Sequence, residues 1–313
     1  MNFFDAVFQG IIQGLTEFLP VSSSGHLAIC QHITGMQESN LFFSVMLHLG
    51  TLAAVLAIYF KLVIKLFSSL VSIIRKMVKR QFKWKEMTGE ENLAMMILIG
   101  LIPLFLLFLP IPGTDMKLKD VAEKFSLDGY FMVVGLALVG TSVLLFFGNL
   151  QRTKIKVVDG KKYRVKPRRR YKIPDALAVG TAQCVAAIFP GLSRSGSTLA
   201  VSQMRGIKKQ VALDYSFLLG TPAIVAAALL ETKDALFSKE GSTNVNFFYV
   251  LVGMIVAAVV GFLAIKLFQW LLNTNRMYIF ILYTAGVGLI VMVISIIELI
   301  AGHNLFTGQP LHF

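Results

Sequence analysis

The residues of this sequence that could do chemistry stand close together near its start, in the stretch QGLTEFLPVSSSGHLA at residues 13–28. An acid, Glu17, is followed there by three serines and by His26. A second stretch, PGLSRSGST at residues 190–198, places Arg194 among further serines. A carboxylate, an imidazole, hydroxyls and a guanidinium around one polar cavity suit phosphoryl transfer, because positioning and charge neutralisation carry most of that reaction.

The two stretches are related to each other as an internal repeat. GIIQGLTEFLPVSSSGHLA near the start aligns with GTAQCVAAIFPGLSRSGSTLA in the middle of the chain, so that Gln13 pairs with Gln183. The two copies differ in charge, since Ala187 stands opposite Glu17 and only the second copy carries Arg194. An acidic half and a cationic half are therefore expected to meet around one ligand.

The elements that position these groups belong to a membrane protein. The chain is 56% hydrophobic and 15% charged, with a mean hydropathy of +0.71, which is outside the range of soluble domains. Apolar segments of roughly 20 residues can cross a bilayer as helices. Six segments qualify: Leu41–Phe60, Leu93–Leu109, Tyr130–Phe147, Ala212–Leu230, Phe247–Phe268 and Tyr278–Ile300. The predicted fold class is an all-α polytopic membrane protein with six full transmembrane helices.

The two polar stretches end helices that are too short to span. A helix over residues 3–19 would be about 25 Å long and would stop at a proline before it cleared the hydrocarbon, and residues 175–189 fit the same description. Each is expected to turn back as a re-entrant hairpin, which is tolerated where protein or a cavity covers it. The prediction is one membrane domain built as an inverted-topology repeat, with halves at about 1–148 and 174–313 and a basic link at about 149–173.

The formal net charge of +13 indicates topology rather than a nucleic-acid partner, because the basic residues lie between the apolar segments. Residues 61–91 carry eight Lys and Arg against three Glu, and residues 150–173 carry eleven against one Asp. The positive-inside rule places both connections in the cytoplasm. Counting crossings from these connections, the first hairpin enters from the outer side and the second from the cytoplasm.

Each turn leads into a helix whose first N–H groups are unpaired, and such helix ends attract phosphate. Gly25, Gly191 and Gly196 would let backbone approach a ligand closely. Gln13 and Glu17 are four residues apart, so they share one helix face. A divalent cation held between Glu17 and phosphate oxygens would fit this chemistry.

At these residues the sequence resembles the undecaprenyl-diphosphate phosphatase family of bacterial inner membranes, the type associated with bacitracin resistance. One family signature is Glu or Gln followed four residues later by Glu and then FLPVSSxGH, and it stands here as QGLTEFLPVSSSGH. The other, PGxSRSxxT, stands as PGLSRSGST. The resemblance runs along essentially the whole chain apart from the basic link, and it includes YSFLLGTP at residues 215–222.

The resemblance implies hydrolysis of undecaprenyl diphosphate to the monophosphate and inorganic phosphate, which recycles the lipid carrier for cell-wall synthesis. It also implies a divalent cation, Mg²⁺ or Ca²⁺, and an active site that opens to the outer side of the inner membrane. By position it assigns catalytic roles to Glu17, Ser23, His26 and Arg194, with Ser23 as the nucleophile. The candidate substrate-binding residues are Gln13, Ser22, Gly25, Gly191, Ser193, Ser195, Gly196 and Thr198.

The resulting hypothesis is that Arg194 and the two turns grip the diphosphate while Ser23 attacks the terminal phosphorus. His26 would exchange the proton, and Glu17 would orient His26 or bind the cation. A water nucleophile activated by His26 is the competing mechanism. Gln13 occupies a place that is Glu in many members and cannot serve as acid, base or strong metal ligand, so Glu17 is the single candidate metal ligand.

Several alternatives stay open at this point. Inverted repeats also build secondary transporters, so a flippase for a polyprenyl phosphate is the rival function. Glu17 and Arg194 could form a buried ion pair without chemistry, and His48 could be a packing or a site-lining residue. The expected partners are the polyprenyl diphosphate and membrane lipids, with no nucleic acid, and a homodimer is left open.

Overall fold

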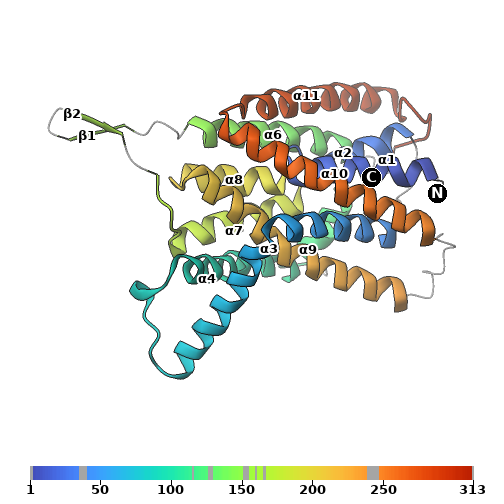
Figure 1. The fold of residues 1–313 in the computed structure, drawn as a ribbon. Coiled ribbons are helices and arrows are strands. Elements are labelled where there is room, and N and C mark those ends of the chain that lie inside the picture. The colour runs from blue at the N-terminus through green and yellow to red at the C-terminus, as the bar shows by residue number, and fades with distance from the viewer. Residues whose placement is uncertain are drawn as a thin grey trace.

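The computed structural model describes residues 3–34, 41–114, 116–125, 130–150, 155–158, 161–164, 167–237 and 247–311. The described chain is mostly helical, and most of its helices run roughly along one common direction (Figure 1). The first half contains α1 Phe3–Phe18, α2 Ser23–Thr34, α3 Leu41–Val78, η1 Trp84–Glu86, α4 Gly89–Leu101, η2 Ile102–Phe108, α5 Leu118–Lys124 and α6 Phe131–Leu150. The second half contains α7 Ile173–Ile188, α8 Arg194–Met204, α9 Lys209–Phe237, α10 Phe247–Asn273 and α11 Tyr278–Ala301.

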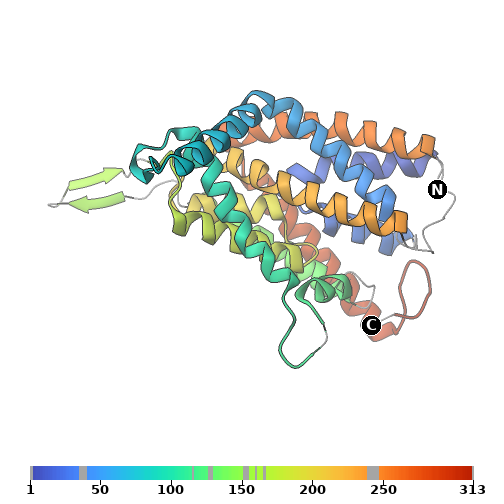
Figure 2. The same cartoon turned by 90° about the horizontal axis from the view of Figure 1, so that it is seen from below.

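Between the halves, the basic link forms an antiparallel pair of strands, β1 Ile155–Val158 and β2 Lys161–Arg164. Their register pairs Ile155 with Arg164 and Val158 with Lys161. Figures 1 and 2 both show the pair lying apart from the helices. A short strand pair in the link is the one described β element that the all-helical expectation did not include.

Five of the predicted membrane spans are confirmed by helices of sufficient length and apolarity among the described residues. These helices are Phe42–Val78, Gly89–Phe108, Phe131–Leu150, Phe247–Asn273 and Tyr278–Ala301, so the chain is a multi-pass membrane protein. The sixth predicted span, Ala212–Leu230, lies inside α9, which carries Asp214 and Pro222 and is not one of the five.

Two of the predicted spans differ in detail from the helices that form. The α-helical part of α4 ends at Leu101 and continues as the 3-10 helix η2, because Pro103 has no N–H to donate to an earlier carbonyl. At the other extreme, α3 continues for 18 residues beyond Phe60, where the predicted span ended at the first basic residue.

The two short helices break where the sequence predicts. Helix α1 ends at Phe18, just before Pro20, and the chain restarts as α2 at Ser23. Helix α7 ends at Ile188, and α8 begins at Arg194. With 16 residues each, α1 and α7 are about 24 Å long. Both helices are therefore shorter than the roughly 30 Å hydrocarbon core of a bilayer, and the turns that follow them are in contact.

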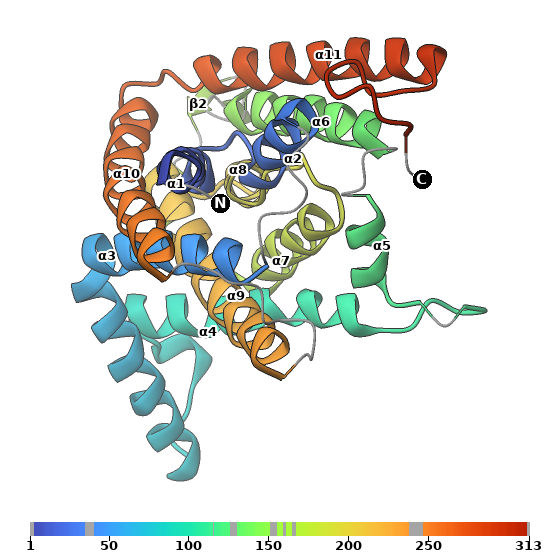
Figure 3. The ribbon, with the colours of Figure 1, turned by 90° about the vertical axis from the view of Figure 1, so that its right-hand side faces the viewer.

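The packing of the two halves follows a matched pattern. Helix α1 packs on α10, and α7 packs on α4 and η2, while α3 lies against α9 and α6 against α11. Repeat-related glycines make two close crossings: a Cβ on Gly10 would lie 2.7 Å from the carbonyl oxygen of Gly253, and one on Gly180 would lie 2.1 Å from that of Gly100. Small residues let helices approach in this way inside membranes. Figure 3 shows α1, α2, α7 and α8 near the centre of the bundle, with the longer helices around them.

Candidate active site

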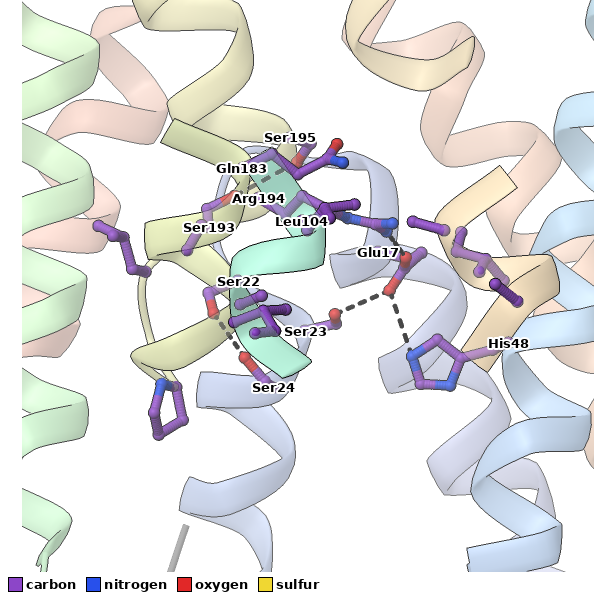
Figure 4. A pocket seen from close by; sticks show the side chains of 18 of the residues that line it. Glu17, Ser22, Ser23, Ser24, His48, Leu104, Gln183, Ser193, Arg194 and Ser195 are labelled. Atoms are coloured by element: carbon purple, nitrogen blue, oxygen red, sulfur yellow. Dashed lines mark hydrogen bonds and ion pairs between the residues drawn. The ribbon is translucent and has the colours of Figure 1, made fainter. Parts of the chain in front are cut away.

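A pocket of about 810 Å³ opens where the turns after α1 and α7 meet. Its polar end is lined by Glu17, Ser23, His48, Ser193 and Arg194, which come from α1, α2, α3 and the start of α8 (Figure 4). Its remaining wall is apolar and comes mainly from η2 and α9. The pocket therefore has one charged end and one apolar side, and this distribution of polarity suits a lipid with an anionic headgroup.

Glu17 lies at the centre of the polar end. Its side chain is 2% exposed, and its Oε1 forms an ion pair with Nη2 of Arg194 from the other half of the chain. Ser23 Oγ donates a hydrogen bond to Glu17 Oε2 at 2.8 Å, and Gln13 Nε2 donates to the same oxygen at 3.0 Å. His48 Nε2 lies 3.8 Å from that oxygen. The predicted meeting of the acidic half with the cationic half is therefore what this fold produces.

Arg194 keeps donors available for a ligand. Its Nη1 donates to the carbonyl oxygen of Gly220 at 3.3 Å, and its Nη2 is the group paired with Glu17. A guanidinium has five N–H donors. Two of these donors have partners among the described residues, which leaves three N–H groups that can donate to phosphate oxygens. The planar fork of arginine is well suited to that contact.

The turns themselves are shaped by local strain and capping. Ser22 has φ of 74°, a left-handed conformation that costs energy for a residue with a side chain, and its Oγ accepts a hydrogen bond from Gly25 N at 3.2 Å. In the second turn, Gly191 has φ of 97°, and Ser193 Oγ accepts from Gly196 N at 3.0 Å. Each serine thus caps the helix that follows its turn.

Contacts between the two turns fix their relative position. Ser195 Oγ donates to the carbonyl oxygen of Leu19 at 3.2 Å, which joins the two turns directly. Gly25 packs against Gly191, and Gly196 packs beside Pro20. From outside the turns, Thr141 of α6 donates to the Gly191 carbonyl at 3.1 Å and accepts from Ser193 N at 2.9 Å.

Six of the predicted site residues line the pocket together: Glu17, Ser22, Ser23, Ser193, Arg194 and Ser195. Gln13 lies one helical turn deeper and reaches the pocket through Glu17. Of the three predicted glycines, Gly191 lies in the second turn, Gly25 lies in α2 and Gly196 lies in α8, and none of them lines the pocket wall. Thr198 is buried behind Arg194, where its Oγ1 donates to the Arg194 carbonyl at 2.9 Å and pairs with the hydroxyl of Ser216.

His26 is not brought into the pocket with the other predicted catalytic residues. Its Nδ1 lies 2.8 Å from the carbonyl oxygen of Ser22, and its Nε2 lies 2.7 Å from the hydroxyl of Tyr283 on α11. The ring also stacks on Tyr283. Both ring nitrogens of His26 are therefore engaged by groups other than Glu17, namely the Ser22 carbonyl and the Tyr283 hydroxyl.

Two pocket residues outside the predicted set, His48 and Gln183, bear on the chemistry of its polar end. His48, left open between packing and lining, faces Glu17 from α3. Gln183 lines the pocket and is fully buried, and neither its Oε1 nor its Nε2 has a hydrogen-bond partner among the described residues. The repeat alignment that pairs Gln183 with Gln13 was the signal that could have identified it.

A preformed metal site does not fit these donors. In the described part of the chain, no three His, Cys, Asp or Glu side chains gather in a metal-binding arrangement. Glu17 is the one carboxylate among the described pocket residues, and Arg194, Ser23 and Gln13 already engage its two oxygens. Divalent cations favour sites with several oxygen ligands. The protein side chains of this pocket therefore do not form a cation site by themselves.

The amino-acid sequence of this chain is similar to those of known proteins of one family. The family model of the bacitracin resistance protein BacA matches residues 6–290. Undecaprenyl-diphosphatase 4 of Bacillus thuringiensis (strain Al Hakam) is 33% identical over 296 residues, covering 94% of this chain and 98% of its own length. The undecaprenyl-diphosphatase of Desulfatibacillum aliphaticivorans is 34% identical over 300 residues, covering 95% and 100%. That of Halothermothrix orenii is 33% identical over 297 residues, covering 94% and 99%. This chain belongs to the BacA family of bacitracin resistance proteins.

Proposed function

We propose that this protein hydrolyses undecaprenyl diphosphate to undecaprenyl phosphate and inorganic phosphate, recycling the carrier lipid and conferring bacitracin resistance. The family and the names of its relatives support this function. The observation that carries it is the Glu17–Arg194 pair at the polar end of a pocket whose other wall is apolar. That arrangement suits a diphosphate at the charged end and a polyprenyl chain along η2 and α9.

The proposed topology has six full spans, with α9 as the sixth, and two re-entrant hairpins, α1–α2 and α7–α8. The halves are about 1–148 and 174–313, related as an inverted repeat around the basic link at about 149–173. The matched packing of α1 on α10 and of α7 on α4 supports this relation, as do the paired glycine crossings. In the bacterial inner membrane, the basic connections would then face the cytoplasm and the pocket would open outward.

The proposed first step is attack by Ser23 Oγ on the terminal phosphorus. The Oγ–P bond forms as the bridging P–O bond breaks, and the bond's electron pair leaves with undecaprenyl phosphate. Glu17 Oε2, which accepts the Ser23 hydroxyl at 2.8 Å, is placed to receive the proton. Water then attacks the phosphoserine as its Oγ–P bond breaks: the water's hydroxyl stays on the phosphorus, its other proton passes to Ser23 Oγ, and inorganic phosphate leaves. The proton held by Glu17 is released to solvent, which restores the carboxylate. Arg194 and the start of helix α8 stabilise charge on the phosphate oxygens.

The geometry favours His48 over His26 as the imidazole that exchanges protons with the Glu17–Ser23 pair. We expect His48→Gln to lower kcat for phosphate release by about 100-fold, because glutamine keeps a polar group there but cannot carry the proton. His26→Gln is expected to cost less than about tenfold, since it perturbs only the contacts with Ser22 and Tyr283.

The measurement is kcat across a pH series for both variants, with thermal unfolding in detergent as the control for folding. Loss of one limb of the pH–rate profile in His48→Gln alone is the expected signature. The opposite ranking, with His26→Gln as the inactive variant, would return the proton-exchange role to His26.

Transport of a polyprenyl phosphate is the rival function, and the two are separable with purified protein. We expect inorganic phosphate to appear when the protein is given undecaprenyl diphosphate in detergent, where no membrane exists to be crossed. EDTA should suppress this release, and added Mg²⁺ or Ca²⁺ should restore it, with the cation arriving on the diphosphate. Lipid movement across vesicles without phosphate release would contradict the phosphatase and support the flippase.

A further inference from the structure

A second surface with a distinct composition lies far from the pocket, on the extended end of α3. Helix α3 has 38 residues and is therefore about 57 Å long, whereas the hydrocarbon core of a bilayer is about 30 Å thick. Figures 1 and 3 show this end leaving the bundle as an arm, which we define as residues 60–79. Helix α3 is therefore longer than a membrane crossing requires, and the arm is the part in excess.

One face of the arm is apolar and exposed. Phe60, Ile64, Phe67, Val71, Ile74 and Val78 recur at spacings of four and three residues, which places them on one side of a helix. Their exposed fractions lie between 52% and 79%. We call this set the apolar stripe. A separate face, with Leu66, Ser69 and Ile73, is buried towards the bundle, so the stripe is not the side that packs on α4.

A basic strip runs beside the apolar stripe. It consists of Lys61, Lys65, Arg75, Lys76 and Lys79, with Ser68 and Ser72 between them. Ser68, Ser72, Arg75, Lys76 and Lys79 line a groove of about 530 Å³. Lys65 and Lys76 are paired with Glu90 and Glu91 of α4, and Lys61, Arg75 and Lys79 form no ion pair with the described residues.

We propose that the arm docks on the membrane surface through anionic phospholipids, with its apolar stripe among the acyl chains and its basic strip at the headgroups. An exposed apolar face flanked by Lys and Arg is the pattern of helices that lie in the interface. Each basic residue near such a surface contributes attraction to anionic lipid. The groove offers the cationic donors of Arg75 and Lys79 to a phosphate, whereas Ser72 and Lys76 already donate to Glu91. The groove that Ser68, Ser72, Arg75, Lys76 and Lys79 line then holds a lipid headgroup.

Charge decides between a lipid surface and a second copy of the chain. Between Phe60 and Lys85 the sequence contains no Asp or Glu, and Glu90 and Glu91 of α4 pair with Lys65 and Lys76 alone. Pairing two apolar stripes would therefore bring Lys61, Arg75 and Lys79 of both copies together without acidic partners among the described residues. Paired helices normally place complementary charges beside their apolar seam. An anionic leaflet supplies the missing negative charge, and a second arm does not.

The test uses the full chain in vesicles with a single tryptophan as a depth probe. The chain has two tryptophans, so Trp84→Phe and Trp270→Phe give a silent background. Phe67→Trp then reports the apolar stripe, and Ser68→Trp is the matched control, one residue away but about 100° around the helix. Quenching by lipids brominated on their acyl chains is measured in phosphatidylcholine vesicles with and without phosphatidylglycerol.

With phosphatidylglycerol present, we expect quenching at position 67 to exceed that at position 68 by at least about twofold. The ratio should fall towards one in pure phosphatidylcholine, and also when Arg75→Gln and Lys79→Gln are introduced together, while phosphate release in detergent stays unchanged. Equal quenching at both positions would overturn the proposal. So would a quenching ratio that is the same with and without phosphatidylglycerol. Shielding of position 67 that rises with protein density and not with anionic lipid would assign the stripe to a second copy.

Discussion

Replacing Arg194 with alanine is expected to lower kcat/KM for phosphate release from undecaprenyl diphosphate by about three orders of magnitude. Among the described residues that line the pocket, Arg194 is the one with a fixed positive charge. It lines the pocket beside Glu17, and arginines that neutralise a transferring phosphoryl group typically have effects of this size. Arg194→Lys keeps the charge and loses the planar fork, so it should recover only part of the rate.

The same substitution also changes stability, and this effect must be separated from chemistry. Removing Arg194 leaves the carboxylate of Glu17 buried without its charged partner, which typically costs about 3 kcal/mol or more. Steady-state phosphate release must therefore be expressed per folded molecule, with the folded fraction taken from thermal unfolding in the same detergent.

Asp175 provides a matched control for this stability effect. Its carboxylate is fully buried, and it pairs with Arg205 at 2.8 Å and with Arg168 at 2.7 Å, outside the pocket. Arg205→Ala removes an arginine from a buried acid and is expected to lower thermal stability while kcat per folded molecule stays unchanged. If Arg194→Ala and Arg205→Ala lost the same activity per folded molecule, the Glu17–Arg194 pair would be structural.

Much of the fold followed from sequence because its causes are local. Apolar segment length identified five spans, and Pro20 marked the end of α1 because proline interrupts helices. The length of α3 could not be predicted in this way. Its arm continues as a helix with a change of pattern rather than a break, so counting apolar residues stopped at the first lysine.

The site was predictable where it depends on the two motifs and not where it depends on tertiary packing. Glu17, Ser23 and Arg194 meet as expected because each stands at the end or start of a broken helix. His26 and His48 could not be ranked from sequence. Which imidazole faces Glu17 depends on how α3 packs beside α1 and on the rotation of α2 about its axis. The spacing of residues in the motif predicts neither of these.

Replacing Ser23 with alanine is the second substitution with a large expected effect. If Ser23 is the nucleophile, kcat should fall by about four orders of magnitude, since loss of a nucleophilic serine removes the covalent route. Ser24→Ala is the matched control. Ser24 lines the same pocket, but its hydroxyl lies 3.3 Å from that of Ser22 and is not bonded to Glu17, so its loss should change kcat by less than about threefold.

A chemical trap distinguishes serine attack from attack by water. Substrate labelled with ³²P on its terminal phosphate is mixed with enzyme and quenched in acid within the first turnover. The wild type and Ser24→Ala should carry protein-bound label at Ser23, and Ser23→Ala should carry none. A water mechanism predicts no labelled protein in any variant and a smaller loss of rate, because Ser23 would then only hold Glu17 in place through its 2.8 Å hydrogen bond. The hydrogen bond to a buried carboxylate is the same in both mechanisms, so only the covalent intermediate can tell a nucleophile from a positioning residue.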